Sequence, residues 1–457
     1  MRYNRAETIA EGRRILALAW PIMLTSLNWT LMQLIDVAMV GQAGTAELGA
    51  LAASRALTFI SIVMGLAALS GVLVFSARDD GAGRLRDTGD RLRSGVMLAL
   101  LLGFAAFAVL MLWAEALLAA IGVAPELHAP GAAVIRAIAL AYPAQYVMAA
   151  ASYFLEGISR PRRVMAVNLG MLPVNALLDW LLVNGHWGFP ALGAVGAALA
   201  TTIASIGGAA AILILCWVLP RAEARGVRDL SRPALKRALR GVPALAWFGL
   251  VPAIAAGLEL AGFSWLIALS TQLGLVPAAA FQAMFSLHNV VFALSMGFGS
   301  AAGVRVGNAV GAGEIEHAWP RAMIAAGLSA LVLGAFALFL ALFAGTMVGP
   351  FSGDAEVRAL AAAMLVLMAP FMLFDGLQYV FTGALRSLGE QVAAGVNGVI
   401  SFFFVTGGLG WLLVRGGWGP DGLVYAAGAG MLVCAALQFA RLAWVLRRGG
   451  RLIPAAG

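Results

Sequence analysis

The chain has 457 residues, of which 62% are hydrophobic and only 11% are charged, and its mean hydropathy is +0.91. Soluble proteins carry roughly 25% charged residues, so this composition excludes a soluble globular protein and indicates an integral membrane protein. The two cysteines, Cys216 and Cys434, lie in apolar segments, which argues against a disulfide framework and against a zinc site.

Twelve apolar segments are long enough to cross a bilayer as helices. The first begins after charged residues, but it is too long for a cleavable signal peptide and has no small-residue cleavage site. We therefore predict an all-α integral membrane protein with twelve transmembrane helices. In chain order the predicted spans are 14–40, 48–77, 94–121, 131–158, 164–184, 191–219, 241–272, 278–307, 321–349, 357–385, 392–414 and 422–446.

The basic residues are distributed unevenly between the two sides of these spans. Of the 30 lysines and arginines, 26 fall at the termini and the even-numbered junctions, and the other side has only Arg55, Arg136, Arg358 and Arg415. The positive-inside rule then predicts an inner-membrane protein with both termini in the cytoplasm. The basic residues that give the net charge of +8 set the orientation of the protein in the membrane, so we expect no nucleic-acid partner. Acids interspersed with arginines over 79–90 predict a solvated loop.

The sequence is internally duplicated. The segment WLLVNGHWG at 180–188 returns as WLLVRGGWG at 411–419, and GAG at 81–83 returns at 311–313. Further matches join Gly44 to Gly274 and Gly157 to Gly383, all in order and at nearly one offset. We predict an N-lobe over 1–219, a basic cytoplasmic linker over 220–240 and a C-lobe over 241–457. Such parallel repeats are common in transporters that work by alternating access.

Polar residues in the first half form one candidate cation site. Asp36 lies within an apolar span, where a charge is costly and is usually functional. Asn175 and Asp179 are four residues apart and therefore share one helix face. With Thr201 they would form an oxygen-rich pocket for Na⁺, or the two acids could share a proton. The alternatives are a solvated acid at the helix mouth and ordinary interhelical hydrogen bonds.

The second half has its own intramembrane acids. Glu259 follows Pro252, and Asp375 follows Pro370, near the middle of their spans. A structural ion pair is the alternative to function, and no Lys or Arg lies at that depth in the sequence. Six further residues are candidates for a substrate cavity, although single residues of this kind more often make interhelical hydrogen bonds or pack in a core. They are Gln33, Gln282, His288, Asn289, Phe371 and Gln378.

No sequence motif of an enzyme or an ATP-driven pump is present: there is no P-loop, GxSxG or HExxH and no Cys/His metal spacing. We therefore expect no enzymatic activity, no cofactor and no metal other than Na⁺. An ion gradient would supply the energy, because one charge moving through 100 mV gains ~2.3 kcal/mol.

Several motifs in order resemble the multidrug and toxic-compound extrusion (MATE) family, specifically its NorM-like branch, over essentially the whole chain. This resemblance implies two six-helix lobes around a V-shaped cavity, and antiport of organic cations against Na⁺ or H⁺. It also implies that Asp36, Asn175, Asp179 and Thr201 match an N-lobe cation site and that Glu259 and Asp375 match C-lobe acids. Phe281 and Phe371 depart from the family pattern, because polar side chains are expected there. The motifs are Pro21 with IDVAMVGQAGTAELGA (35–50), LEGISRPRR (155–163), LPVNALLDWLLVNGHWGFPALGAVGAALAT (172–201), MGFGSAAGVRVGNAVGAG (296–313) and DGLQYVFTGALRSLG (375–389).

These observations together predict a monomeric secondary efflux antiporter for organic cations or amphipathic drugs in the lipid bilayer. A lipid-linked or metabolite flippase of the same superfamily is the nearest alternative, but it would favour a strongly basic cavity over an acidic one. A channel or a non-transporting receptor is a second alternative, and neither explains acids in both halves of the chain.

Overall fold

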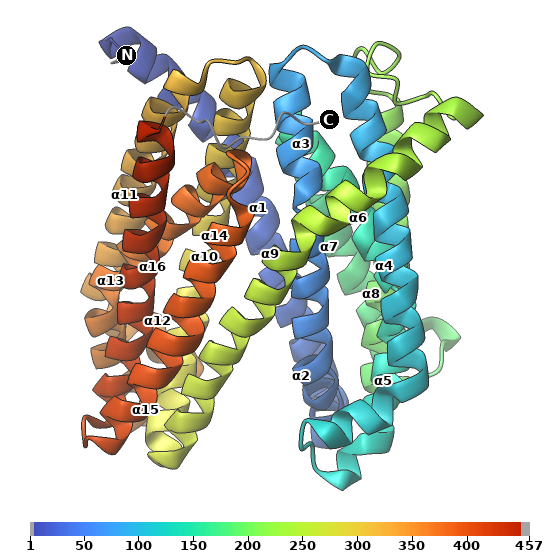
Figure 1. Ribbon diagram of the computed structural model, residues 1–457. Helices are drawn as coiled ribbons and strands as arrows, with labels where there is room; N and C mark the ends of the chain where they lie inside the picture. Colours follow the sequence, from blue (N-terminus) through green and yellow to red (C-terminus); the bar gives the residue numbers. More distant parts are fainter. Residues whose placement is uncertain (1–3, 449–457) are drawn as a thin grey trace. The chain divides into compact units, whose positions relative to one another are not determined.

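The computed structural model describes residues 4–448, and within that range the chain is helical, with no strand (Figure 1). Eleven helices are long and apolar enough to cross a membrane, and the bent pair Pro125–Ala139 and Tyr142–Gly157, which meet at 46°, makes twelve if it counts as one span. The predicted all-α fold is therefore confirmed. The α-helices are α1 (Arg5–Ala43), α2 (Thr45–Ala68), α3 (Gly71–Gly81), α4 (Leu85–Ala120), α5 (His128–Ala139), α6 (Tyr142–Gly157), α7 (Pro161–Asn184), α8 (Gly193–Trp217), α9 (Arg232–Gln272), α10 (Leu275–Gly311), α11 (Ala318–Leu342), α12 (Ala344–Val348), α13 (Ala355–Ser387), α14 (Gln391–Gly398), α15 (Gly407–Arg415) and α16 (Gly419–Arg447).

Short segments of other helix types complete the structure. Four are 3₁₀ turns: η1 (Pro125–Leu127), η2 (His186–Gly188), η3 (Ile315–His317) and η4 (Gly349–Phe351). The fifth, η5 (Val399–Thr406), is a π-helical segment between α14 and α15. It interrupts the regular α-helical turn within the predicted span 392–414, and such segments are rare and often found at functional sites.

The chain divides into two compact units. Unit 1 comprises Met1–Met23, Gly81–Gly83 and Ile254–Gly457, and unit 2 comprises Leu24–Asp80 and Arg84–Ala253. The long helices α1 and α9 each contribute one part to each unit. In both helices the boundary falls within two residues of a proline, Pro21 or Pro252, which removes a backbone hydrogen bond from the helix. The units therefore differ from a simple division of the sequence into halves.

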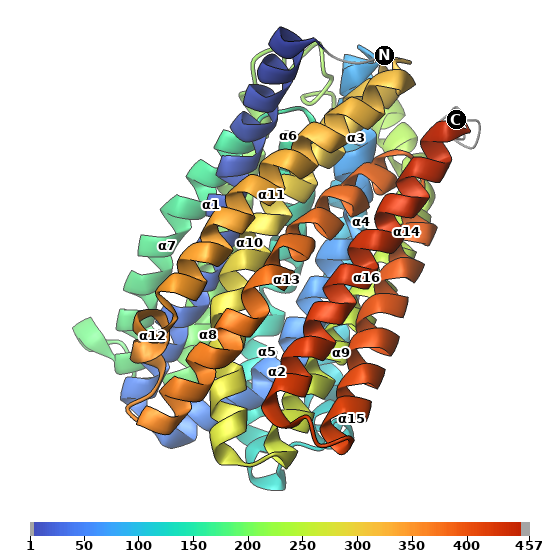
Figure 2. The ribbon, with the colours of Figure 1, turned by 90° about the vertical axis from the view of Figure 1, so that its left-hand side faces the viewer.

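Within unit 1, α13 packs against α10, α11 and α16 (Figure 2). Its buried residues include Met364, Leu365, Met368 and Met372, which form a core with residues of α10 and α16. Within unit 2, α4 packs on α6, and α7 packs on α8. The fully buried Tyr142 and Phe154 of α6 are among the largest side chains in that core. Each unit thus has its own apolar core.

The internal repeat is visible in equivalent backbone positions. Gly44 and Gly274 precede α2 and α10 with φ values of 135° and 115°, a region that favours glycine. A side chain on Gly157 would meet Leu73 O and Ala77 N, and one on Gly383 would meet the matching Gly299 O and Gly303 N. Leu73 and Ala77 precede Gly299 and Gly303 by 226 residues, which is also the separation between Gly157 and Gly383. The same close helix contact therefore occurs once in each repeat.

Replacement of Gly383 by alanine is expected to lower the thermal unfolding midpoint of the purified protein clearly. The new methyl group would collide with the backbone carbonyl of Gly299 and force α10 and α13 apart, and overpacking of this kind costs ~1–3 kcal/mol. Gly327→Ala in α11 is the matched control, because nothing lies within 4 Å of its added methyl group and alanine favours the helix. Equal midpoints for the two variants would contradict the close contact.

The charged segment 79–90 is not simply a solvated loop, because its first two acids lie in the last turn of α3 and the first of them is buried, so that prediction was wrong for Asp79. Asp79 is only 1% exposed and pairs with Arg84 at 2.5 Å and with Arg91 at 2.8 Å. Asp80 pairs with Arg225 at 2.7 Å, which joins part of the predicted linker to the end of α3 within unit 2. Sequence alone could not show this, because the partners come from segments up to 145 residues apart.

Candidate functional site

Two carboxylates of unit 2 meet at one amide. Asp36 comes from α1, and Asn175 and Asp179 come from one face of α7. The Asn175 Nδ2 group donates one hydrogen bond to Asp36 Oδ1 at 2.9 Å and one to Asp179 Oδ2 at 2.8 Å. All three residues are at most 9% exposed. The predicted convergence of these side chains is therefore present in the structure.

Two oxygens of this cluster have no hydrogen-bond partner among the described residues. They are Asn175 Oδ1 and Asp179 Oδ1, and both are buried. The carboxylates use both hydrogens of the amide NH2 group, and the amide oxygen, which carries no hydrogen, can only accept a hydrogen bond or bind a cation. A buried oxygen without a partner is costly. The arrangement therefore favours a proton or a cation at these atoms.

Arg55 of α2 is the residue of this cluster that the sequence analysis did not identify. Its Nη2 lies 3.3 Å from Asp36 Oδ2 and donates a hydrogen bond to the Gln33 carbonyl at 3.2 Å. In the sequence, Arg55 is one of the four basic residues on the less basic side of the membrane, and no motif connects it with this site. The structure places it beside an acid 19 residues away, because α1 and α2 are neighbours after the turn at Gly44.

A small cavity of about 90 Å³ adjoins the cluster. Gln33, Asp36, Arg55 and Thr201 all line it, together with Trp29 and Gln145 and apolar side chains. A water molecule occupies ~30 Å³ in the liquid, so this space suits a few waters or an ion, and it is far below the ~300–1,000 Å³ of ligand pockets. Thr201 lies at this cavity but makes no hydrogen bond to Asn175 or Asp179 among the described contacts.

A second polar cluster surrounds Asp375 in unit 1. Ser295 Oγ donates to Asp375 Oδ2 at 3.1 Å, and Gln378 Nε2 donates to Asp375 Oδ1 at 3.3 Å. His288 Nε2 lies 3.8 Å from Asp375 Oδ2, and neither nitrogen of its ring has a hydrogen-bond partner among the described residues. His288 and Asp375 are each 3% exposed. Ser295 was missed from the sequence because a serine in a helix has no distinctive local signal.

Glu259 interacts electrostatically with Asp375 of this second cluster but makes no hydrogen bond to it among the described residues. Its carboxylate is next to Gly398 of α14, where a side chain would collide with it, and it interacts electrostatically with Arg386. Arg386 is therefore a positive charge near Glu259 that was not expected from the sequence. Among the hydrogen bonds and ion pairs of residues 4–448, none joins Glu259 to Asp375.

The other predicted cavity residues are dispersed. Gln282 and Asn289 are exposed, whereas Gln378 is buried on Asp375. The Phe371 ring lies against Gly428 of α16 and is a helix-packing contact in this structure.

Comparisons with known proteins agree on one family. The MatE family model matches residues 21–181 and 253–412. A curated relative, "Probable multidrug resistance protein NorM" of Bradyrhizobium diazoefficiens, is 31% identical over 95% of this chain and 93% of its own length. The crystal structure of the Vibrio cholerae MATE transporter VcmN has a TM-score of 0.85 at 18% identity and covers 96% of this chain and 98% of its own. A Pyrococcus furiosus structure has a TM-score of 0.83 at 19% identity, covers 96% of both chains, and is described as a MOP superfamily transporter whose binding pocket has reverse polarity and suggests a different function.

Proposed function

Because the chain belongs to the MatE family of transporters, we propose that it exports organic cations in exchange for Na⁺ or H⁺. The relative from Bradyrhizobium is named a multidrug resistance protein, which supports drugs or similar amphipathic cations as the exported class. The chain is a membrane transporter and not an enzyme.

The cluster of Asp36, Asn175 and Asp179 is the observation that carries this proposal. With both carboxylates ionised, two negative charges stand against the one positive charge of Arg55, so this empty form of the cluster has a net charge of −1. One monovalent cation or one proton neutralises it, and the unpartnered Asp179 Oδ1 and Asn175 Oδ1 are the oxygens available to bind that ion. A buried charge without compensation costs several kcal/mol, which gives the ion a driving force to enter.

Each residue of this cluster has its own part in the proposed cycle. Asn175 holds the two acids together, and Asp179 takes the coupling ion. Arg55 compensates the charge of Asp36 while no ion is bound. The small cavity beside these residues is large enough for the coupling ion but too small for the organic cation. Asp375 with Ser295, Gln378 and His288 is the corresponding polar cluster of unit 1, and Glu259 is a further acid of that unit.

In the transport cycle, the coupling ion and the organic cation compete for the same negatively charged carboxylates. The coupling ion enters from outside and neutralises these acids, which releases the organic cation that they attract. The two lobes then alternate their access, the ion leaves to the cytoplasm, and the next substrate enters. This scheme places the protein in the inner membrane as a monomer with both termini in the cytoplasm, in agreement with the distribution of 26 and four basic residues.

Ethidium transport into proteoliposomes tests the proposal. With the protein reconstituted and a Na⁺ or a pH gradient imposed, one of the two gradients is expected to drive ethidium uphill. A gradient equivalent to 100 mV is worth ~2.3 kcal/mol per charge, enough for more than about tenfold accumulation. Addition of an ionophore that collapses the gradient is the control.

Movement of ethidium under neither gradient, with a folded protein, would contradict the proposal. It would favour the flippase alternative, in which the intramembrane acids select the substrate. The Pyrococcus structure illustrates that a chain of this fold can carry a pocket of the other polarity. The acidic clusters of this chain support the cation exporter.

A further inference from the structure

The first turns of α14 and the last turns of α16 line a groove on unit 1, and none of its lining residues belongs to either acidic cluster. The groove has a volume of about 550 Å³, within the ~300–1,000 Å³ range of ligand sites. Its two helices are held together by Gln438, whose Nε2 donates to the Ala394 carbonyl at 2.9 Å and whose Oε1 accepts from Asn397 Nδ2 at 3.2 Å. The two walls are therefore fixed relative to each other.

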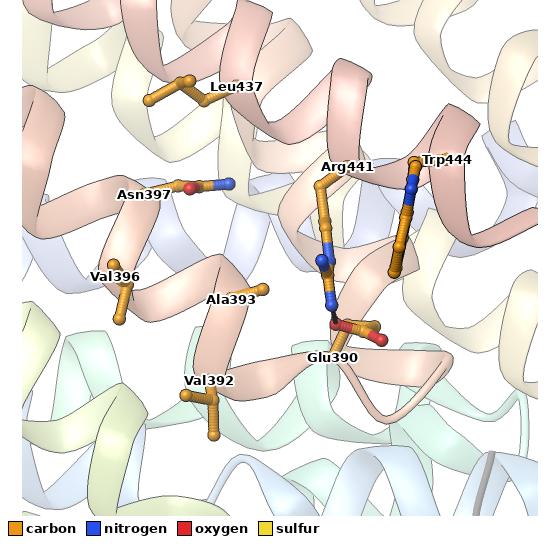
Figure 3. A pocket seen from close by; sticks show the side chains of 8 residues that line it. All are labelled: Glu390, Val392, Ala393, Val396, Asn397, Leu437, Arg441 and Trp444. Atoms are coloured by element: carbon orange, nitrogen blue, oxygen red, sulfur yellow. Dashed lines mark hydrogen bonds and ion pairs between the residues drawn. The ribbon is translucent and has the colours of Figure 1, made fainter. Parts of the chain in front are cut away.

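One end of the groove is basic and aromatic. Arg441 and Trp444 line it (Figure 3), and the guanidinium group of Arg441 lies 4.3 Å from the centre of the Trp444 ring. Arg448 is not part of the lining, but its guanidinium group lies 4.1 Å from the centre of the same ring. Of the described residues that line the groove, Glu390 is the one acid, and its Oε2 accepts from Arg441 Nη2 at 2.7 Å. Two arginines against one glutamate leave this end with a positive charge.

The remainder of the groove is apolar. Val392 and Val396 are 52% and 48% exposed, and they lie away from the Arg441 end, as does Leu437 on the other wall (Figure 3). In a membrane protein an exposed apolar wall of this kind is suited to contact an acyl chain. Tryptophan and arginine at the end of a transmembrane helix are typical of the headgroup level, and basic pockets between helices bind anionic headgroups.

We propose that this groove binds an anionic phospholipid. Its phosphate contacts Arg441 and Arg448, and an acyl chain lies along Val392, Val396 and Leu437. Charge complementarity selects the occupant: a cationic drug would be repelled by the two arginines, and a zwitterionic lipid would bring a cation of its own to them.

Glu390 competes with this phosphate for Arg441. Its side chain is 12% exposed and already accepts two hydrogen bonds from Arg441, at 3.0 Å from Nε and 2.7 Å from Nη2. An arriving phosphate has to share or displace these bonds. Loss of the Glu390 charge should therefore strengthen lipid binding, which a purely structural ion pair would not produce.

The test measures binding of phosphatidylglycerol and phosphatidylcholine with identical acyl chains to the full-length protein in detergent, by native mass spectrometry. We expect phosphatidylglycerol to bind about tenfold more tightly than phosphatidylcholine. Glu390→Gln should raise its affinity several-fold, and Arg441→Gln/Arg448→Gln should abolish the preference. Arg358→Gln, an exposed arginine at the start of α13, is the control and should bind like the unaltered protein.

Three results would overturn the proposal. They are equal binding of the two lipids, a Glu390→Gln variant that binds phosphatidylglycerol no better, and an arginine double variant that keeps the preference. Soluble glycerol phosphate is a further arm: if it competes as well as the lipid does, the site recognises free phosphate and not a lipid. Because the Glu390→Gln variant gains affinity, misfolding cannot imitate its expected result.

Discussion

Cells that produce the Asp36→Asn variant are expected to be as sensitive to ethidium as cells that lack the protein. Asparagine keeps the size of the side chain and one acceptor oxygen for Asn175 Nδ2, but its NH2 group cannot accept the hydrogen bond from Arg55. The charge of the cluster changes, because Arg55 then compensates Asp179 and the net charge becomes zero. A coupling cation has no charge left to neutralise, and the exchange stops.

Growth inhibition in a strain without its own efflux pumps measures this effect, and the amount of protein in the membrane is measured in parallel. Asp421→Asn at the start of α16 is the matched control, since it removes an exposed acid outside both clusters and should leave resistance unchanged. Normal resistance in Asp36→Asn cells with a normal amount of protein would exclude this cluster as the coupling site.

The double variant Asp36→Asn/Arg55→Leu is expected to regain transport that Asp36→Asn alone has lost. Removal of both members of the ion pair leaves Asp179 as the one charge of the cluster, so the net charge returns to −1. Neighbouring residues of one charged network are strongly non-additive, and we expect roughly tenfold more transport than in the single variant. Initial rates of ethidium transport in proteoliposomes provide the measurement.

Two companion variants make this prediction specific. Arg55→Leu alone leaves two uncompensated carboxylates, a net charge of −2, and should transport poorly because the ion is held too tightly. Asp36→Asn/Arg358→Leu removes an arginine far along the chain and should stay as inactive as Asp36→Asn. If the Asp36→Asn/Arg55→Leu variant is equally inactive, the Asp36 carboxylate itself is required, and net charge is not the controlling quantity.

The groove at Arg441 would connect transport to the surrounding bilayer. It is lined by residues of α14 and α16, and α14 leads directly into the π-helical segment η5. An anionic lipid in this groove would stabilise one packing of these helices. Its occupancy can be varied without changing any residue of the two acidic clusters, so the effects of lipid and of coupling ion can be measured separately.

The sequence by itself determined the class of protein, the helical spans, the internal repeat and the residues worth testing. Each of these rests on local information: hydropathy over about 20 residues, helix periodicity, and a match between two segments of one chain. The shared face of Asn175 and Asp179 is an example, because a spacing of four residues places two side chains on the same side of any α-helix. The misfit of Asp36 in an apolar span is another.

Only the tertiary structure decided which of these residues meet. Asp36 pairs with Arg55 of the next helix and with Asn175, 139 residues further on, while Asp375 meets Ser295 of α10 and has no direct bond to Glu259 among the described contacts. Such contacts depend on the rotation of each helix about its axis and on which helices are neighbours. Packing of the apolar cores sets both the rotation of each helix and its neighbours, and neither can be read from the sequence of a single helix.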